Sequence, residues 1–277
     1  SIITEAGELV KEGFYTTKQI SYKSPSDPVT NIDLASETLI RERLKQYFPD
    51  IEVLGEEYGG NIISDELRWV IDPIDGTRNF AAGIPHFCVS IGLVQGNNPI
   101  VGAIYDPIRD ELFFAQSNQG ATLNGEVMQV STKTNPEDFI IGLDIGHVDN
   151  KAIHAFKLIE NLFPTMQSLR ILGSAALGMA YAASGRIDIF LHHSLSPWDI
   201  AAGLLLVTES NGITLDKETL KQAILKLSTR ERRIIYLRFY GGLSQAEIAE
   251  RLELSQMHIS RLLSKAIKHL QEELQRH

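Results

Sequence analysis

The chain has 277 residues, of which 43% are hydrophobic and 22% are charged, so it can bury a sizeable core and hold more than one folding unit. This composition excludes collagen-like, low-complexity and intrinsically disordered proteins. No apolar run approaches the ~20 residues of a membrane-spanning helix, and the N-terminus lacks a signal-peptide pattern, so we expect a cytoplasmic protein with no membrane partner. Cys88 is the one cysteine, which excludes an internal disulfide framework and a thiolate zinc cluster.

The net charge of −9 is unevenly distributed along the chain. Residues 216–277 hold 12 Lys and Arg against 8 Asp and Glu, a net of +4, whereas the preceding residues hold 14 against 27, a net of −13. Acidic clusters suit metal ions, and basic helical segments suit nucleic acids. The charge division therefore predicts two modules with different partners.

Two amphipathic helices are predicted at the start, because apolar residues recur at helical spacing in residues 2–15 and 35–48. Proline and polar residues predict a turn or loop at residues 24–28. Short apolar runs separated by Asp, Pro, Gly and Asn then predict a sheet built largely of meanders, with strands at residues 69–71, 88–94, 100–105 and 112–115.

Helical and strand patterns alternate in the next part of the chain. The expected elements are a strand at 139–143, a helix at 151–163, an Ala-rich segment at 174–184, a strand at 187–191 and a helix after Pro197. Together with the preceding sheet they predict mixed layers of helix and sheet, an α/β fold class.

Beyond Gly212 the pattern is wholly helical, which predicts a small all-α module. Residues 228–231 and 244–247 both fit the S-x-x-E capping box, in which each end of the motif satisfies a free amide at a helix start. No Gly/Ser-rich or Pro-rich linker precedes the module at residues 214–217, so we expect a direct junction.

The strongest local motif is the block at residues 69–77, Trp-Val-Ile-Asp-Pro-Ile-Asp-Gly-Thr. A buried strand ends there in Asp72 and Asp75, Pro73 interrupts the ladder, and Gly76 permits a tight turn with outward amides. Paired carboxylates and a backbone carbonyl are the oxygen ligands that a hard divalent cation needs. The block predicts a site for cations and phosphate, although alone it also fits a polar strand end.

Other motifs accompany this block in the chain, namely residues 27–33, Gly55-Glu56-Glu57, Gly173-Ser174-Ala175-Ala176 and Trp198-Asp199. With this set, residues 2–214 closely resemble the inositol monophosphatase family of magnesium-dependent sugar phosphatases. The resemblance implies a layered α-β-α-β-α sugar phosphatase fold, here lacking the last strands and helix. It also implies Mg²⁺ as the cofactor and a small phosphate-ester substrate, either inositol phosphate or a related sugar phosphate.

The resemblance further implies two metal sites, the first held by Glu56, Asp72 and the carbonyl of Ile74 and the second by Asp72, Asp75 and Asp199. Two cations can neutralise the phosphate oxygens and the leaving alkoxide, while one of them lowers the pKa of the attacking water. All of these ligands precede the helical module, so the site can assemble without it.

The amides of Gly76 and Thr77 would hold the phosphate, by the same resemblance. Glu56 and Thr77 would orient or deprotonate the water, and Asp33 would support Thr77 from behind. The catalytic residues expected are therefore Glu56, Thr77 and Asp33.

Substrate contacts are expected from Arg78, Ser174, Ala175 and His192. Arg78 replaces a small or polar residue of many relatives and can add a charge-assisted contact to phosphate. His192 stands where the animal enzymes have an acid that contacts inositol hydroxyls, but a solvent-exposed strand end is an equal alternative. Ser174 and Ala175 bring backbone close to the sugar, or merely begin a packed helix. The exact ester and the choice between monomer and homodimer are left open.

Residues 243–270 fit two helices joined by a tight turn, with inner faces formed by Ile248, Ala249, Leu252, Ile259, Leu262, Leu263, Ala266, Ile267 and Leu270. Periodicity alone favours a plain helical hairpin. The residue order is more specific, because residues 215–271 closely resemble region four of bacterial sigma factors, a promoter-binding helix-turn-helix that docks on RNA polymerase. Glu253 occupies the turn position where glycine is frequent.

That resemblance implies promoter DNA and RNA polymerase as partners of the helical module. By position, Gln256, Met257, Ser260 and Arg261 would contact bases, while Lys265 and Arg251 would contact phosphates. The sigma-factor regions that clamp polymerase and melt promoters have no counterpart in residues 1–214, so the chain is not expected to be a complete sigma factor.

We therefore expect two domains, a metal-dependent phosphatase at residues 1–214 and a helix-turn-helix at residues 215–277. The expected activity is magnesium-dependent hydrolysis of a phosphomonoester. Two alternatives stay open: a DNA-binding transcription protein whose phosphatase-like part is inactive, and a non-physiological fusion of two gene fragments.

Overall fold

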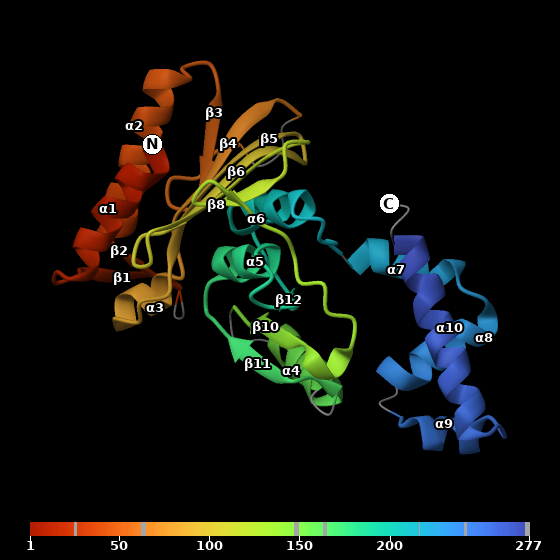
Figure 1. The fold of residues 1–277 in the computed structure, drawn as a ribbon. Helices are drawn as coiled ribbons and strands as arrows, with labels where there is room; N and C mark the ends of the chain where they lie inside the picture. The colour runs from red at the N-terminus through yellow and green to blue at the C-terminus, as the bar shows by residue number, and fades with distance from the viewer. Residues whose placement is uncertain are drawn as a thin grey trace. The chain divides into compact units, whose positions relative to one another are not determined.

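The computed structural model describes residues 1–24, 27–61, 65–146, 150–162, 165–215, 217–240 and 243–274 (Figure 1). The chain divides into two compact units, the first comprising Ser1–Phe156 with Thr165–Gly212 and the second Lys157–Pro164 with Ile213–His277. Over the described residues, every helix is too short or too polar to span a bilayer.

Helices α1 (Ile2–Phe14) and α2 (Asn31–Tyr47) confirm the two predicted N-terminal helices. Helix α2 begins at Asn31, ahead of the apolar repeat, because the Thr30 side chain accepts hydrogen bonds from the amides of Ile32 and Asp33. Between the helices, β1 (Ile20–Ser24) and β2 (Asp27–Thr30) form an antiparallel hairpin. The loop predicted at 24–28 is therefore wrong at its ends, and residues 25 and 26 lie outside the described residues.

A seven-stranded sheet in the order β3-β4-β5-β6-β7-β8-β9 follows. Strands β3 and β4 are parallel and all later neighbours are antiparallel, which confirms the predicted meander. The short helix α3 (Thr77–Ala82) follows β4 directly. The strands are β3 (Glu52–Gly55), β4 (Leu67–Asp75), β5 (Cys88–Gln95), β6 (Asn98–Asp106), β7 (Glu111–Gln116), β8 (Ala121–Leu123) and β9 (Glu126–Val127).

A second sheet has the order β11-β10-β12 and is parallel throughout. Parallel neighbours need crossover connections, and helices supply them between successive strands. The Ala-rich segment is helical, and the strand predicted at 187–191 begins later, at Ile189. The elements of this part are a 3₁₀ turn η1 (Pro136–Asp138), β10 (Ile140–Asp144), α4 (Asn150–Leu162), β11 (Ser168–Ile171), α5 (Ala175–Ala183), β12 (Ile189–His192) and α6 (Pro197–Glu209).

Helices cover both faces of the seven-stranded sheet (Figure 1). Helices α1 and α2 bury Ile3, Val10 and Ile40 on one face, and α5 and α6 bury Leu177 and Leu206 on the other. Helix α5 also contacts β10 and β12 of the second sheet. The layers thus alternate helix, sheet, helix and sheet, so the predicted layered α/β class is confirmed.

The second unit is helical over its described elements α7 (Lys217–Lys226), α8 (Thr229–Ile235), π-helical η3 (Tyr236–Tyr240), α9 (Gln245–Arg251) and α10 (Gln256–Leu274). Both predicted capping boxes are present, because Ser228 and Ser244 each cap the amide of the glutamate three residues later. Glu253 adopts a left-handed backbone with φ 54° in the turn between α9 and α10. The domain boundary after residue 214 stays a prediction.

The apolar residues predicted for the inner faces of α9 and α10 do form a core. Ile248, Ala249 and Ile259 are buried with Leu237, whereas Leu263 and Ala266 are buried with Leu227, Ile234 and Ile235. Leu252, Leu262, Ile267 and Leu270 are partly buried against these clusters. The predicted helical period is therefore confirmed in this unit.

Candidate metal centre

Three carboxylates from two elements meet in the first unit. Asp72 and Asp75 lie at the end of β4, and Asp199 lies in the first turn of α6. One oxygen from each lies within 4.8 Å of the others. Asp72 is 1% exposed and Asp75 is 7% exposed, so two of these acids are withdrawn from water. Carboxylate oxygens grouped in this way suit a hard divalent cation.

The end of β4, which carries Asp72 and Asp75, has an irregular backbone. Its pairing with β5 shifts register between Asp72 and Asp75, and Pro73 between them has no amide to donate. The Ile74 amide donates to Asp72 Oδ1 at 3.0 Å, which fixes the Asp72 rotamer. The prediction that a buried strand ends in Asp72 and Asp75 is therefore confirmed.

The other two carboxylates are held by helix N-termini. Asp199 completes a capping box in α6, where the Ser196 amide donates to Asp199 Oδ2 at 2.6 Å. Asp75 accepts from the amides of Ala175 and Ala176, at 3.2 and 2.9 Å, and from the Ser174 hydroxyl. The predicted substrate residues Ser174 and Ala175 are thus buried hydrogen-bond donors to Asp75 in this structure.

Burial raises the pKa of each acid in this group. The pKa of Asp72 lies well above its ordinary value, first through burial and then through the negative charge of Glu56. Burial also raises the pKa of Asp75 to about 6 and of Asp199 to about 7. Burial is the first cause of each shift and neighbouring negative charges add to it, so a bound cation would favour the ionised forms.

Glu56, a predicted ligand of the first metal, follows β3 and is not a member of the 4.8 Å group. Its Oε1 accepts from Lys23 Nζ at 2.8 Å, and Lys23 bonds Glu57 Oε1 at the same distance. Burial raises the pKa of Glu57 to about 7. The β1–β2 hairpin thus brings the Lys23 ammonium group to the loop that carries Glu56 and Glu57. The sequence pattern did not indicate this contact.

Thr77 and Asp33 lie together as predicted. Thr77 Oγ1 lies 3.1 Å from Asp33 Oδ1 and 2.9 Å from the Ile74 carbonyl oxygen, so its proton can be donated to either. Burial raises the pKa of Asp33 to about 6. Gly76 is the N-cap of α3 and has φ 93°, a left-handed conformation that glycine adopts without strain.

Arg78 and His192 lie near the end of β10. Arg78 Nη1 donates to the Gly146 carbonyl oxygen at 2.6 Å. His192 is half-buried and stacks on His193, with ring centroids 5.4 Å apart, and its Nδ1 accepts from the Ser194 amide at 3.0 Å. Burial lowers the pKa of His192 to about 4, so the ring is neutral at pH 7.

Asp144 is a buried acid of this region that the motifs did not single out. It ends β10, lies opposite His192 in the sheet register, and is 8% exposed. Its negative charge contributes to the raised pKa of Asp75 and Asp199. Its position at the carboxyl end of a parallel strand is the available signal, because ligand sites of α/β sheets lie at that edge.

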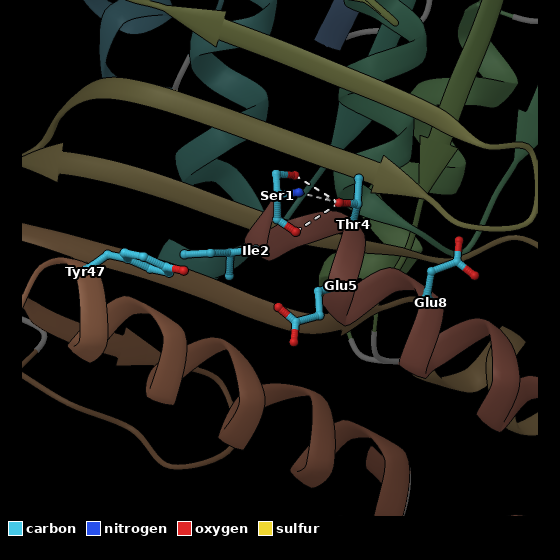
Figure 2. A pocket seen from close by; sticks show the side chains of 6 residues that line it. All are labelled: Ser1, Ile2, Thr4, Glu5, Glu8 and Tyr47. Carbon is cyan, nitrogen blue, oxygen red and sulfur yellow. Dashed lines mark hydrogen bonds between the residues drawn. The ribbon is translucent and has the colours of Figure 1, made fainter.

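A separate hollow in the first unit contains none of the predicted site residues. Figure 2 shows Ser1 bonded to Thr4 beside it. Its lining belongs to the surfaces of α1 and α2, namely Ser1, Ile2, Thr4, Glu5, Glu8 and Tyr47.

The residues predicted to contact DNA lie on α9 and α10. Arg251, Gln256, Met257, Arg261 and Lys265 are exposed, and Ser260 is half-buried. Exposed side chains of this kind can contact a partner, and the roles of these residues stay predictions.

Comparison with known proteins gives a consistent family. A sequence model of the inositol monophosphatase family matches residues 1–253, which extends beyond the boundary predicted at residue 214. Inositol monophosphatase 1 of Solanum lycopersicum is 41% identical over 218 residues, covering 76% of this chain and 80% of the relative. The Nus factor SuhB of Salmonella typhimurium is 38% identical over 216 residues, covering 76% and 81%.

Solved structures agree with the sequence relatives. The suhB protein of Bartonella henselae superposes with a TM-score of 0.72 at 35% identity, over 76% of this chain and 82% of that one. An IMPase of Thermotoga maritima superposes with a TM-score of 0.71 at 34% identity, over 78% and 82%. The sigma-factor resemblance of residues 215–271 remains a prediction. The chain belongs to the inositol monophosphatase family of metal-dependent enzymes and is a phosphatase.

Proposed function

We propose that the protein hydrolyses the phosphomonoester of inositol or of a related sugar, with Mg²⁺ as its cofactor. The observation that carries the proposal is the meeting of Asp72, Asp75 and Asp199 within 4.8 Å. The family membership of the chain supports the same reaction class.

The donor set fits a hard divalent cation. Asp72, Asp75 and Asp199 would hold one Mg²⁺, and Glu56, Asp72 and the Ile74 carbonyl would hold the other. When bound, Mg²⁺ would neutralise phosphate charge and lower the pKa of a water. The raised pKa of each acid in the group supports this assignment, because a cation would offset both the cost of burying these charges and the effect of neighbouring negative charges.

Thr77 and Asp33 would orient the attacking water. A Thr77 hydroxyl that donates to Asp33 or to the Ile74 carbonyl has its lone pairs available to accept from water. Glu56 would accept the proton of that water once its contact with Lys23 opens. The amides of Gly76 and Thr77 would hold the phosphate at the start of α3.

The alcohol portion of the substrate would lie toward Arg78, Ser174, Ala175 and His192. Neutral His192 can donate to a hydroxyl group through Nε2–H, because its Nδ1 accepts from the Ser194 amide and carries no proton. Arg78 lies in the first turn of α3, and its side chain is held by the Gly146 carbonyl. These contacts suit a polyol with several hydroxyl groups.

Phosphate release tests the proposal directly. Inositol, fructose and nucleotide phosphates should be compared with Mg²⁺ and with excess chelator. We expect turnover of an inositol or sugar phosphate that chelator abolishes and that Asp72→Asn destroys, while Glu42→Gln on the exposed side of α2 keeps it. Turnover that persists with chelator or in Asp72→Asn contradicts the proposal.

A second candidate function is promoter-type DNA binding by α9 and α10. The left-handed Glu253 turn joins the two helices, and Gln256, Met257 and Arg261 are exposed at the start of α10. Such a helix can enter a major groove, with Ser260 beside it and with Lys265 and Arg251 on phosphates. RNA polymerase would be a further partner. The name Nus factor SuhB, which several relatives carry, supports a link to transcription.

Gel shifts at several salt concentrations test this second function. DNA binding that weakens with salt and is lost in Arg261→Ala supports it, because phosphate contacts release counterions. An absent or salt-independent shift contradicts it. DNA binding without phosphatase turnover would favour a transcription protein with an inactive phosphatase part, and neither activity would favour a fusion of gene fragments.

A further inference from the structure

Helix α2 presents three buried polar side chains on one face. Asp33, Ser36 and Glu37 are each 0% exposed and are spaced at i, i+3 and i+4. Asp33 bonds Thr77, and Ser36 Oγ donates to the Pro73 carbonyl oxygen at 3.2 Å, inside the irregular end of β4. The side chains of Asp33 and Ser36 therefore each bond a segment that belongs to the metal centre.

Glu37 bonds the remaining segment, the loop after β3. Its Oε2 accepts from the Glu57 amide at 2.8 Å, and its Oε1 accepts from the Tyr58 amide at 3.2 Å. These amides directly follow Glu56 in the chain. A Cβ on Gly55 would collide with the Glu37 carboxylate, so the loop approaches it closely on both sides of Glu56.

Arg41 completes this anchor one helical turn later. Its Nε donates to Glu37 Oε1 at 2.8 Å, and its other nitrogens donate to the carbonyls of Val53 at 3.1 Å and Gly59 at 2.6 Å. The buried charge of Glu37 is thus paired, and the guanidinium spans both ends of the loop. A buried carboxylate is costly unless it is paired and hydrogen-bonded, and here both conditions hold.

The side chain of Glu56 is not fixed by the acidic group itself, since it lies outside that group and bonds Lys23. Glu37 instead holds the backbone directly after Glu56, through the amides of Glu57 and Tyr58. We propose that Glu37 is a positioning residue that orients Glu56 toward the metal centre and thereby sets the affinity for the cation. This inference rests on the proposed function of Glu56 as a metal ligand.

Glu37→Gln tests the inference, because an amide offers one acceptor oxygen in place of two and directs an NH₂ toward backbone donors. We expect the dissociation constant for Mn²⁺, measured by calorimetry without substrate, to rise about 10-fold. The Mg²⁺ concentration for half-maximal phosphate release should rise by the same factor, while kcat at saturating Mg²⁺ stays within about twofold, since excess cation restores occupancy.

Two controls separate positioning from loss of stability. Ile40→Val removes a buried methyl group from α2 and should lower the Tm without changing the Mn²⁺ constant. Glu42→Gln removes an exposed charge from the same helix and should change neither. If Glu37→Gln fails to fold, Arg41→Lys keeps the charge, loses contacts to the loop carbonyls, and should shift the constant in the same direction.

An unchanged Mn²⁺ constant in Glu37→Gln, or in Arg41→Lys where the first variant does not fold, would overturn the inference. Such a result would leave a purely structural role for the anchor. Failure of the wild-type protein to bind Mn²⁺ would instead contradict the proposed function, so the two failures are distinguishable.

Discussion

Asp72 is the residue at which activity and stability oppose each other most directly. It lies buried among like charges, and its pKa is raised well above its ordinary value. Asp72→Asn removes that charge while keeping the side-chain shape. We expect phosphate release to fall at least about 100-fold, because the residue is a proposed ligand of both cations.

The same substitution should stabilise the metal-free protein, since burial first and then the charges of neighbouring acids disfavour an ionised Asp72. Thermal melting in chelator checks this, with a Tm increase of about 2–4 °C for each kcal/mol relieved in a protein of this size class. A lower Tm for Asp72→Asn in chelator would show that Asp72 is not destabilising when ionised.

The acids of the site also predict how stability depends on pH. Burial raises the pKa of Asp75 to about 6 and of Asp199 to about 7, above the values of an unfolded chain. The folded protein therefore binds more protons than the unfolded one between about pH 4 and 7, so their contribution to stability is lost as pH rises through this window.

We expect the metal-free Tm of Asp199→Asn to fall less between pH 5 and pH 8 than that of the wild type. Loss of the Asp199 charge also removes one of the causes that raise the pKa of Asp72, which acts in the same direction. Cation affinity should change in the opposite direction and strengthen with rising pH, because the ligands must be deprotonated. Parallel pH profiles for the two proteins in chelator would contradict this assignment.

The acids that sequence could predict are those in contiguous blocks with backbone signals, such as Asp72 and Asp75 beside Pro73 and Gly76. Lys23 and Asp144 could not be predicted, because each approaches the site through a hairpin or a second sheet. Glu37 was likewise hidden, since a Glu in a helix is ordinarily solvated. Its burial depends on a loop 20 residues away packing against it.

At the scale of elements, the fit of α6 on the sheet positions Asp199. Gly92 and Gly102 are paired across β5 and β6, and a Cβ on either would collide with α6 at Ala201 or Ala202. Gly102→Ala should lower the free energy of unfolding by about 1–3 kcal/mol through overpacking.

Displacement of α6 by Gly102→Ala should also weaken Mn²⁺ binding, because the helix carries Asp199. Calorimetry and thermal melts measure both effects. Val127→Ala on β9 is the control, since Val127 is 78% exposed and its substitution should change stability by less than about 0.5 kcal/mol. An unchanged Mn²⁺ constant in Gly102→Ala would show that the site tolerates movement of the helix.

Periodicity predicted most helices and the antiparallel meander because these signals are local. It did not predict β3 as a parallel neighbour of β4, or β11 as an edge strand of the second sheet. Strand pairing of this kind joins segments far apart in the chain and is fixed by tertiary packing. The Ala-rich segment was not assigned to a helix or a strand, since small residues pack closely in both.

At the scale of the whole molecule, the two units have cores made of different residues. The clusters of the first unit contain the sheet residues next to Asp72 and Asp75, whereas the cluster of Leu237, Ile248, Ala249 and Ile259 belongs to the second. The acidic excess before residue 216 includes the acids of the candidate metal centre. The basic excess after it is compatible with DNA or with a solvated helical surface.

Cation binding should therefore stabilise the protein through the first unit. At a Mg²⁺ concentration of 100 Kd the expected increase in the free energy of unfolding is about 2.7 kcal/mol. The Tm should rise by about 2–4 °C for each kcal/mol of this increase. Ile259→Ala should lower the stability of the second unit by about 2–5 kcal/mol, because it leaves a cavity in that cluster.

The increment that Mg²⁺ gives to the first unit should be the same in Ile259→Ala and in the wild type, because Ile259 belongs to a cluster that contains no site residue. Calorimetric melts with Mg²⁺ and with chelator measure the increment in both proteins, and Asp72→Asn should abolish it. A smaller increment in Ile259→Ala would mean that folding of the helical unit is coupled to the metal centre. In that case residues 1–253, which the family model matches, would unfold as one cooperative structure.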